Sequence, residues 1–246
     1  MSGSAHQTSG SANVVLDARN LVKSFGGVHA TQNVSIHVVD REIFGLIGPN
    51  GSGKTTLLNL LAGFYQPDAG SIVFRGQAIA GRSANEIARL GLVRSWQDPR
   101  TIGSLTVREN VELGSVASGR TGPAQKARIA ELLEKFELMP VSHQRAAELP
   151  YGKQKIVALA RTFAVQPTLL MLDEPLAGLS IPEQQQMVGY IREFQRVGSV
   201  IIVDHAFSVM AKLCDRLVVL NSGQKLAEGT PAEISADRRV AEVYLG

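Results

Sequence analysis

The chain has 246 residues, 44% of them hydrophobic, which is the composition of a globular protein with a substantial core and predicts one large domain or a domain with a subdomain. Its formal net charge of +3 comes from dispersed basic residues, and we interpret it as a feature of solubility rather than of a nucleic-acid or anionic-membrane surface. The single cysteine, Cys214, excludes an internal disulfide, and no apolar run approaches the roughly 20 residues that cross a bilayer.

The beginning of the chain differs from the rest in composition. Met1 to Asn13 is rich in Ser and Gly and lacks the hydrophobic region of a signal peptide. We expect an unstructured leader over residues 1–13, followed by a folded domain over 14–246. Cys214 lies in an apolar helical stretch, so a buried structural thiol in a reducing cytosol is expected.

The first part of the domain is predicted to be rich in strands. Alternating or β-rich runs predict strands at Val14–Ala18, Val34–Val39, Ile43–Ile47 and Ser71–Phe74. Helical periodicity follows Lys54, and a second helix is expected at Ala84–Leu90, before a short strand at Leu92–Arg94.

From about residue 98 to 154 the pattern becomes mostly helical. Helices are predicted at Val107–Leu113 and Ala124–Phe136. In the second helix, apolar residues recur at the spacing that places them on one face, and this stripe predicts core packing rather than a binding surface. Its members are Ile129, Leu132, Leu133 and Phe136.

The last part of the chain alternates between helices and apolar strands. Helices are predicted at Lys153–Val165, Pro182–Val197 and Phe207–Leu213, with a short terminal helix. Strands are predicted at Thr168–Leu172, Ser199–Val203, Leu217–Leu220 and Gln224–Glu228. Nearly continuous apolar strands that alternate with helices predict a parallel sheet flanked by helices, with ligands at the carboxyl ends of the strands.

The segment from Gly48 to Thr55 carries the phosphate-binding pattern G-x-x-x-x-G-K-[ST] between a strand-like run and a helix-forming run. Its glycines let the backbone curl so that successive N–H groups point at an anion, and the following helix adds its partial positive charge. Lys54 would reach the β- and γ-phosphates, and the Thr55 hydroxyl would ligate Mg²⁺. The sequence therefore predicts a nucleoside triphosphate site made of Gly48, Pro49, Asn50, Gly51, Ser52, Gly53, Lys54, Thr55 and Thr56.

A second motif, which is acidic, follows the predicted strand at 168–172. Asp173 and Glu174 follow this apolar run directly, at the sheet edge where the phosphate loop is expected. Asp173 there can hold Mg²⁺ through its water shell, and Glu174 can orient or deprotonate the attacking water. Taken alone, the motif is equally consistent with a strand followed by a solvated acidic turn.

Two further polar residues follow predicted strands. His205 comes just after Ser199–Val203, where it could hydrogen-bond a γ-phosphate or the water that attacks it, although an isolated His is more often structural. Gln97 follows the short strand at 92–94 and could reach Mg²⁺ and the water. Neither residue is informative by itself.

Together, these elements resemble the ATPase subunit of ABC transporters in both order and spacing, from about Val14 to Gly246. The matching elements are Phe25, the phosphate loop at 48–55, Gln97, the signature region Leu149–Gln154, the acidic strand end at 169–174, Leu176–Ser180 and His205. The resemblance implies an α/β fold: a P-loop ATPase core with a parallel sheet, an antiparallel β subdomain, and a helical insert at about 98–154 that carries the signature motif.

The resemblance also implies roles for individual residues. Phe25 matches the aromatic residue that stacks on the adenine of ATP, with core burial as the competing interpretation. Glu174 matches the general base and His205 the γ-phosphate switch, whereas Gly178 matches the loop that communicates across a dimer. The phosphate and Mg²⁺ contacts match Lys54, Thr55, Asp173 and Gln97. In this family two ATPase subunits sandwich ATP, and each supplies its signature motif to the phosphate loop of the other.

The signature itself departs from the family pattern L-S-G-G-Q. Here it reads Leu149-Pro150-Tyr151-Gly152-Lys153, and Pro150 provides neither a hydroxyl nor an N–H, so two expected γ-phosphate contacts are absent. Gly152 keeps its place and can still receive an anion with its N–H at the start of a helix.

This variant resembles the subgroup that transports branched-chain amino acids and related solutes. The stretches that agree are Ser24–Gly27, Val93–Gln97, Glu228–Pro231 and Val243–Gly246.

The resemblance implies a peripheral ATPase on the cytoplasmic face of the inner or plasma membrane. It would hydrolyse Mg·ATP to drive import of branched-chain amino acids or a related small polar solute. Its partners would be transmembrane permease subunits, a second ATPase subunit (itself or a sister chain) and, indirectly, a periplasmic or extracellular solute-binding protein, with no nucleic acid. The segment Asp98–Leu105 matches the groove where a coupling helix of the permease docks.

Two alternatives remain open at this point. A soluble ABC-type ATPase of DNA repair, chromosome or translation work would need a long coiled coil or a second ATPase unit, and the segment between Gln97 and Leu149 has no room for sustained heptads. A regulatory module that binds nucleotide without turnover is favoured slightly by the altered signature. It is disfavoured by the intact set of site residues, Lys54, Asp173, Glu174 and His205.

Overall fold

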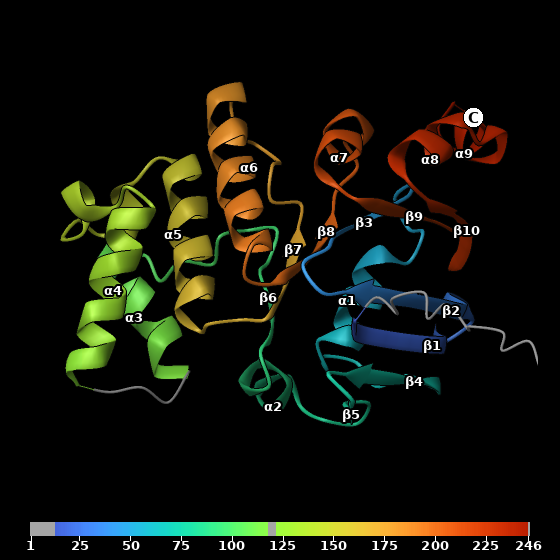
Figure 1. The fold of residues 1–246 in the computed structure, drawn as a ribbon, viewed down its shortest axis with the longest axis horizontal. Helices are drawn as coiled ribbons and strands as arrows, with labels where there is room; N and C mark the ends of the chain where they lie inside the picture. Colours follow the sequence, from blue (N-terminus) through green and yellow to red (C-terminus); the bar gives the residue numbers. More distant parts are fainter. Residues whose placement is uncertain (1–12, 118–121, 246) are drawn as a thin grey trace, which may run out of the picture.

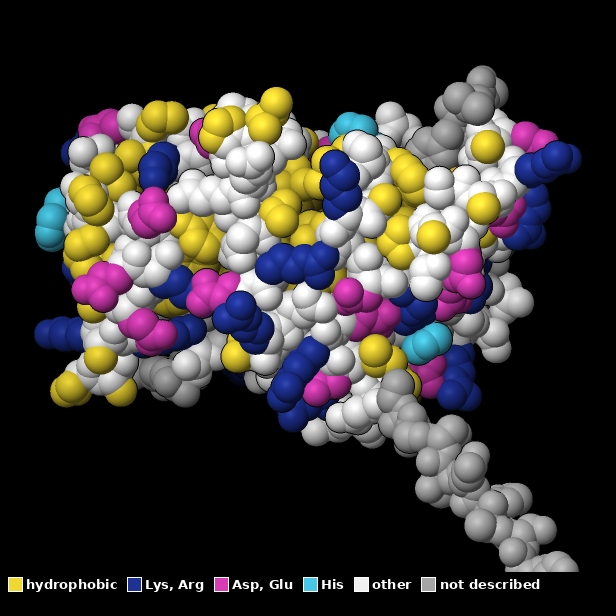
Figure 2. Space-filling model, turned by 45° about the horizontal axis from the view of Figure 1, so that its top comes forward, with side chains coloured by type: hydrophobic (Ala, Val, Ile, Leu, Met, Phe, Trp, Pro, Cys, Tyr) yellow, Lys and Arg dark blue, Asp and Glu magenta, His cyan; other side chains and the backbone are white. Residues whose placement is uncertain are grey.

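The computed structural model describes residues 13–117 and 122–245. Residues 1–12 of the predicted leader lie outside this range. The described chain forms two sheets with helices around them, and helices α3, α4 and α5 stand together at one end (Figure 1). Figure 2 shows basic and acidic side chains interspersed over one face rather than gathered into fields of one sign.

A six-stranded sheet forms the centre of the molecule, in the order β10-β9-β3-β8-β7-β6. Its strands are β3 (Ile43–Ile47), β6 (Leu92–Arg94), β7 (Leu169–Asp173), β8 (Ser199–Val203), β9 (Arg216–Asn221) and β10 (Gln224–Gly229). All pairs are parallel except β10 with β9. Every residue of β3, β7 and β8 is buried, because helices and a second sheet cover both faces. The predicted parallel sheet is confirmed.

The two faces of this sheet form two separate cores. Within β3, Ile43 and Ile47 pack with residues of α3 to α7, whereas Phe44 and Leu46 pack with α1 and the second sheet. This division follows from the alternation of side chains along a strand. Cys214 lies in the first core at 6% exposure, which confirms the predicted buried thiol.

The second sheet is antiparallel, in the order β2-β1-β4-β5. It consists of β1 (Val14–Phe25), β2 (Val28–Val39), β4 (Ala69–Phe74) and β5 (Gln77–Ala78), and α1 (Lys54–Leu61) packs beneath it. The antiparallel β subdomain is thus confirmed. The strands predicted at 14–18 and 34–39 were too short, because β1 and β2 stay paired through half-exposed polar positions that carry no apolar pattern.

The remaining helices up to α7 match the predicted ones closely, and the end of the chain differs. They are α2 (Ala84–Arg89), α3 (Val107–Ala117), α4 (Pro123–Lys135), α5 (Tyr151–Ala164), α6 (Ile181–Gln195), α7 (Phe207–Leu213), α8 (Pro231–Ala236) and α9 (Arg238–Leu245), with short 3₁₀ turns at Met139–Val141 and Ala146–Glu148. The apolar stripe of α4 is fully buried, as predicted. The single terminal helix was wrong: Asp237 takes an extended conformation and divides it into α8 and α9. None of the described helices is long and apolar enough to span a membrane.

Helices α3 and α5 approach each other closely at Gly114. A Cβ at this position would lie 1.9 Å from the carbonyl oxygen of Arg161, so only glycine fits. Arg161 in turn donates from Nη1 to the Arg100 carbonyl at 2.8 Å and from Nη2 to the Pro99 carbonyl at 3.0 Å. This side chain ties α5 to the segment that follows β6.

Candidate active site

The phosphate loop joins the end of β3 to the start of α1. Gly48 and Gly53 have φ angles of 150° and 102°, and a Cβ would lie 2.2 Å from the Leu220 carbonyl oxygen at the first and 2.3 Å from that of Ala30 at the second. Both positions therefore require glycine, since other side chains would clash with backbone. Gly53 caps α1, so the free N–H groups of the helix start point into the loop.

Lys54 bends back over this loop. Its Nζ donates to the carbonyl oxygens of Gly48 at 2.8 Å and Pro49 at 2.9 Å. Burial lowers the pKa of Lys54, and the charges of Glu174 and Asp173 oppose that shift. The ammonium group is thus held by neutral carbonyls inside the loop, where phosphate oxygens would be stronger partners.

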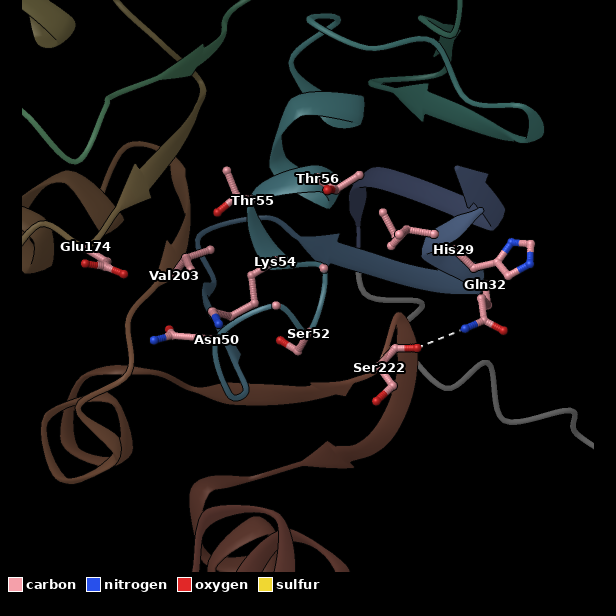
Figure 3. A pocket seen from close by; sticks show the side chains of 14 residues that line it. His29, Gln32, Asn50, Ser52, Lys54, Thr55, Thr56, Glu174, Val203 and Ser222 are labelled. Carbon is pink, nitrogen blue, oxygen red and sulfur yellow. Dashed lines mark hydrogen bonds between the residues drawn. The ribbon is translucent and has the colours of Figure 1, made fainter. Parts of the chain in front are cut away.

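A cavity of about 490 Å³ lies over the loop. In Figure 3 the loop separates Glu174 on one side from His29 and Gln32 on the other, and the Gln32 side chain donates to the Ser222 carbonyl at 2.9 Å. The cavity is lined by Val28, His29, Ala30, Gln32, Asn50, Gly51, Ser52, Gly53, Lys54, Thr55, Thr56, Glu174, Val203 and Ser222. The predicted loop residues from Asn50 to Thr56 and Glu174 therefore face one shared space, whereas Gly48 and Pro49 do not line it.

Three side chains predicted from separate motifs meet at the carboxyl ends of neighbouring strands. Gln97 donates from Nε2 to Oε2 of Glu174 at 2.6 Å, and Nδ1 of His205 lies 3.9 Å from Oε1 of the same carboxylate. They follow β6, β7 and β8, which are adjacent in the sheet. A carboxylate between an amide and an imidazole can hold a water molecule and accept its proton.

Asp173 has a partner that the sequence motifs do not predict. Arg94 donates from Nη2 to Oδ2 of Asp173 at 2.6 Å, and its other terminal nitrogen donates to the Asn59 side chain. The Arg94 guanidinium also lies 4.5 Å from the centre of the Trp96 ring. The only signal in the sequence was an arginine at the end of a short strand, and nothing there specifies a partner 79 residues away.

The oxygen donors near the loop suit Mg²⁺. Arg94 engages one oxygen of Asp173, and Glu174 engages the amide nitrogen of Gln97. The other Asp173 oxygen and the Gln97 amide oxygen therefore stay available for a cation, as does the Thr55 hydroxyl. A hard cation prefers such oxygen ligands and keeps several waters. Across residues 13–117 and 122–245, no cluster of three or more His, Cys, Asp or Glu side chains offers a different metal site.

Phe25 ends β1 beside the cavity without lining it. Its paired residue Val28 belongs to the lining, and its ring meets that of Tyr65 edge to face at 5.1 Å. At 42% exposed, Phe25 is not part of the core, which contradicts the alternative of core burial. Stacking on adenine stays a prediction.

The signature region lies at the start of α5, outside the cavity. Pro150 caps the helix, whose first internal bond runs from the Gln154 N–H to the Pro150 carbonyl. The N–H groups of Tyr151, Gly152 and Lys153 precede this bond, so they are free of intrahelical partners. Gly152 itself does not line the cavity formed by the phosphate loop of the same chain.

Comparison with known families agrees with this geometry. The family model described as ABC transporter matches residues 31–177, and the model described as Branched-chain amino acid ATP-binding cassette transporter matches residues 224–246. The chain is 36% identical to the High-affinity branched-chain amino acid transport ATP-binding protein LivG of Salmonella typhimurium, with 94% of this chain and 98% of that protein covered. It is 33% identical to the protein BraF of Pseudomonas aeruginosa, which carries the same description, over the same shares.

Solved structures show the same fold. A nucleotide-free ATP-binding cassette from an ABC transporter superposes with a TM-score of 0.88 at 28% identity, covering 95% of this chain and 99% of that chain. A structure described as the ADP conformation of an ATP-binding cassette of an ABC transporter superposes with a TM-score of 0.88 at 29% identity over the same shares. The chain therefore belongs to the ABC transporter family, as an ATP-binding subunit of its branched-chain amino acid subgroup.

Proposed function

We propose that this chain hydrolyses ATP to drive import of branched-chain amino acids or a related small polar solute, with Glu174 as the general base. The observation that carries the catalytic part is that Gln97 and His205 both approach the carboxylate of Glu174, which lines the cavity. Gln97 and Glu174 hold the attacking water between them, and His205 contacts the γ-phosphate. The assignment of the solute is supported by the names of the relatives, which mention branched-chain amino acid transport.

The phosphate loop binds the triphosphate of ATP through its N–H groups and the α1 N-terminus. Lys54 exchanges its two carbonyl partners for the β- and γ-phosphates, a change favoured by the opposite charges. Thr55, Gln97 and Asp173 hold Mg²⁺, which when bound neutralises charge that develops on the transferred phosphate. Phe25 stacks on adenine next to the cavity.

The site is completed by a second ATPase subunit, either another copy or a sister chain, which presents its own Gly152 region to the γ-phosphate. This arrangement is supported by the position of Gly152 outside the cavity of its own chain. Transmembrane permease subunits dock at the segment 98–105 on the cytoplasmic face of the membrane, and a solute-binding protein delivers cargo to them. Along the chain, we propose an unstructured leader at 1–13 and one ATPase domain at 14–246, which contains a helical subdomain at about 98–154.

Glu174→Gln tests the central role. The variant keeps the shape of the carboxylate but cannot accept a proton, so we expect hydrolysis to fall by about 10²–10⁴-fold, as removal of a general base does. ATP binding should persist, because Lys54 and the loop are unchanged. Phosphate release and titration with a fluorescent ATP analogue measure the two quantities. Turnover at the wild-type rate would show that Glu174 is not the base.

A further inference from the structure

Lys155 is a buried lysine whose three N–H donors all meet backbone. It is 5% exposed, and its Nζ donates to the carbonyl oxygens of Ala177 at 2.7 Å, Glu174 at 3.0 Å and Pro175 at 3.4 Å. No carboxylate of the described residues lies within ion-pair distance of this ammonium group. A buried charge needs hydrogen-bond partners or a counter-ion. The partners of Lys155 are all carbonyl oxygens of one turn, so we infer that Lys155 holds this turn in place.

That turn holds the proposed general base. Glu174 has a φ of +45°, a region that residues with side chains rarely adopt. Its N–H donates to the Val203 carbonyl of β8 at 2.8 Å, and its carbonyl oxygen accepts from the Ala177 N–H at 3.3 Å as well as from Lys155. The backbone of Glu174 is therefore fixed on one side by the sheet and on the other by α5.

The same end of α5 carries the signature residues. The Tyr151 ring covers Gly178, where an added Cβ would lie 3.0 Å from Cε1, and the Lys155 ammonium lies 5.5 Å from the centre of that ring. At Gly152 an added Cβ would lie 2.0 Å from the Glu183 carboxylate. The first two turns of α5 thus touch the segment 174–183 at three places.

We propose that Lys155 is a positioning residue that couples the start of α5 to Glu174. The start of α5 contacts the nucleotide of the second subunit, so occupancy of that site is transmitted through Lys155 to the base of this chain's own site. The inference rests on the proposed function, in which Glu174 is the base and Gly152 acts across a dimer.

Lys155→Met, in the full chain, removes the three hydrogen bonds and keeps much of the buried length. We expect kcat to fall by about 10²-fold, the cost of a misplaced catalytic group, and the Hill coefficient for ATP to fall towards 1. The dissociation constant of a fluorescent ATP analogue should stay within about twofold, because the phosphate loop is untouched. Lys155→Arg should recover part of kcat, since it restores charge and donors. Lys126→Met, on the exposed face of α4, is the matched control and should change nothing.

Two results would overturn the inference. One is wild-type kcat and Hill coefficient in Lys155→Met, and the other is a parallel loss of ATP binding and turnover, which indicates a merely structural role. If Lys155→Met does not fold by circular dichroism, the same criteria apply to Lys155→Gln, which keeps the polar group without the charge.

A double variant separates this inference from the proposed function. Since Lys155 acts through Glu174, adding Lys155→Met to Glu174→Gln should lower the residual turnover no further. An inactive Glu174→Gln beside a fully active Lys155→Met would refute the coupling alone. An active Glu174→Gln would refute the assigned base itself.

Discussion

At the scale of single residues, the ion pair between Arg94 and Asp173 is buried and includes a proposed ligand of Mg²⁺. The two side chains are only 2% and 10% exposed, and Arg94 is also bound to Asn59. Two charges removed from water have lost their hydration, so the attraction between them mainly offsets that loss. Removal of one partner leaves the other charge buried and unpaired.

Arg94→Met creates this situation. We expect the free energy of unfolding to fall by about 3–5 kcal/mol, the usual cost of breaking a buried pair from one side. Urea denaturation measures the change. Arg89→Met, at an exposed position of α2, is the control and should stay within about 0.5 kcal/mol of the parent chain. Equal stability of the two variants would show that Asp173 finds another partner.

At the scale of elements, the contact between α3 and α5 decides how firmly the segment after β6 is held. Gly114 lets the two helices touch through backbone, and Arg161 on the same turn of α5 holds the carbonyls of Pro99 and Arg100. A shift of α5 against α3 would therefore also move the carbonyls held by Arg161, which belong to the segment proposed to meet the permease.

Gly114→Ala should push the two helices apart. The added methyl would lie 1.9 Å from the Arg161 carbonyl oxygen, and we expect a loss of about 1–3 kcal/mol in the free energy of unfolding. Gly189→Ala is the matched control, because that helical position opens into empty space. It should raise stability by up to about 1 kcal/mol through helix propensity. Thermal and urea unfolding of both variants test the contrast, and a neutral Gly114→Ala would contradict the close packing.

The elements also show what the sequence can and cannot predict. Strands β3, β6 and β8 and helix α7 were placed to the residue, because apolar runs with clear ends mark buried elements. The two-residue strand β5 was missed, since both its residues are exposed and give no pattern.

At the site, the phosphate loop and the Asp173–Glu174 motif could be predicted because each is a continuous stretch of sequence. Lys155 and Arg94 instead depend on partners brought near by the fold, which no spacing encodes.

At the scale of the whole molecule, the nucleotide cavity and the Gly152 region are separate surfaces. Each chain therefore offers two half-sites, and in the proposed sandwich each is completed by the other subunit. Pro150 removes two of the contacts expected from the signature, so the strength of a symmetric dimer depends on the N–H groups that remain at the start of α5.

Light scattering of Glu174→Gln, with and without Mg·ATP, measures that strength. Blocked hydrolysis keeps ATP in place, so we expect the mass to double when Mg·ATP is added. Glu174→Gln combined with Lys54→Ala is the control and should remain monomeric, because Lys54 is needed for the phosphates. A monomer that binds ATP would indicate pairing with a sister ATPase, and failure to bind ATP at all would contradict the proposed function.

The strand that delivers the phosphate loop lies between two strands from the far end of the chain. In β3, Phe44 pairs with Ile201 of β8 and with Arg216 of β9. On the ribosome, β3 is synthesised long before β8 and β9. Its apolar residues therefore lack their strand partners while about 150 further residues are made. Folding of the central sheet is consequently a late event in synthesis, and a nascent chain that lacks β8 and β9 cannot yet shape the loop that holds ATP.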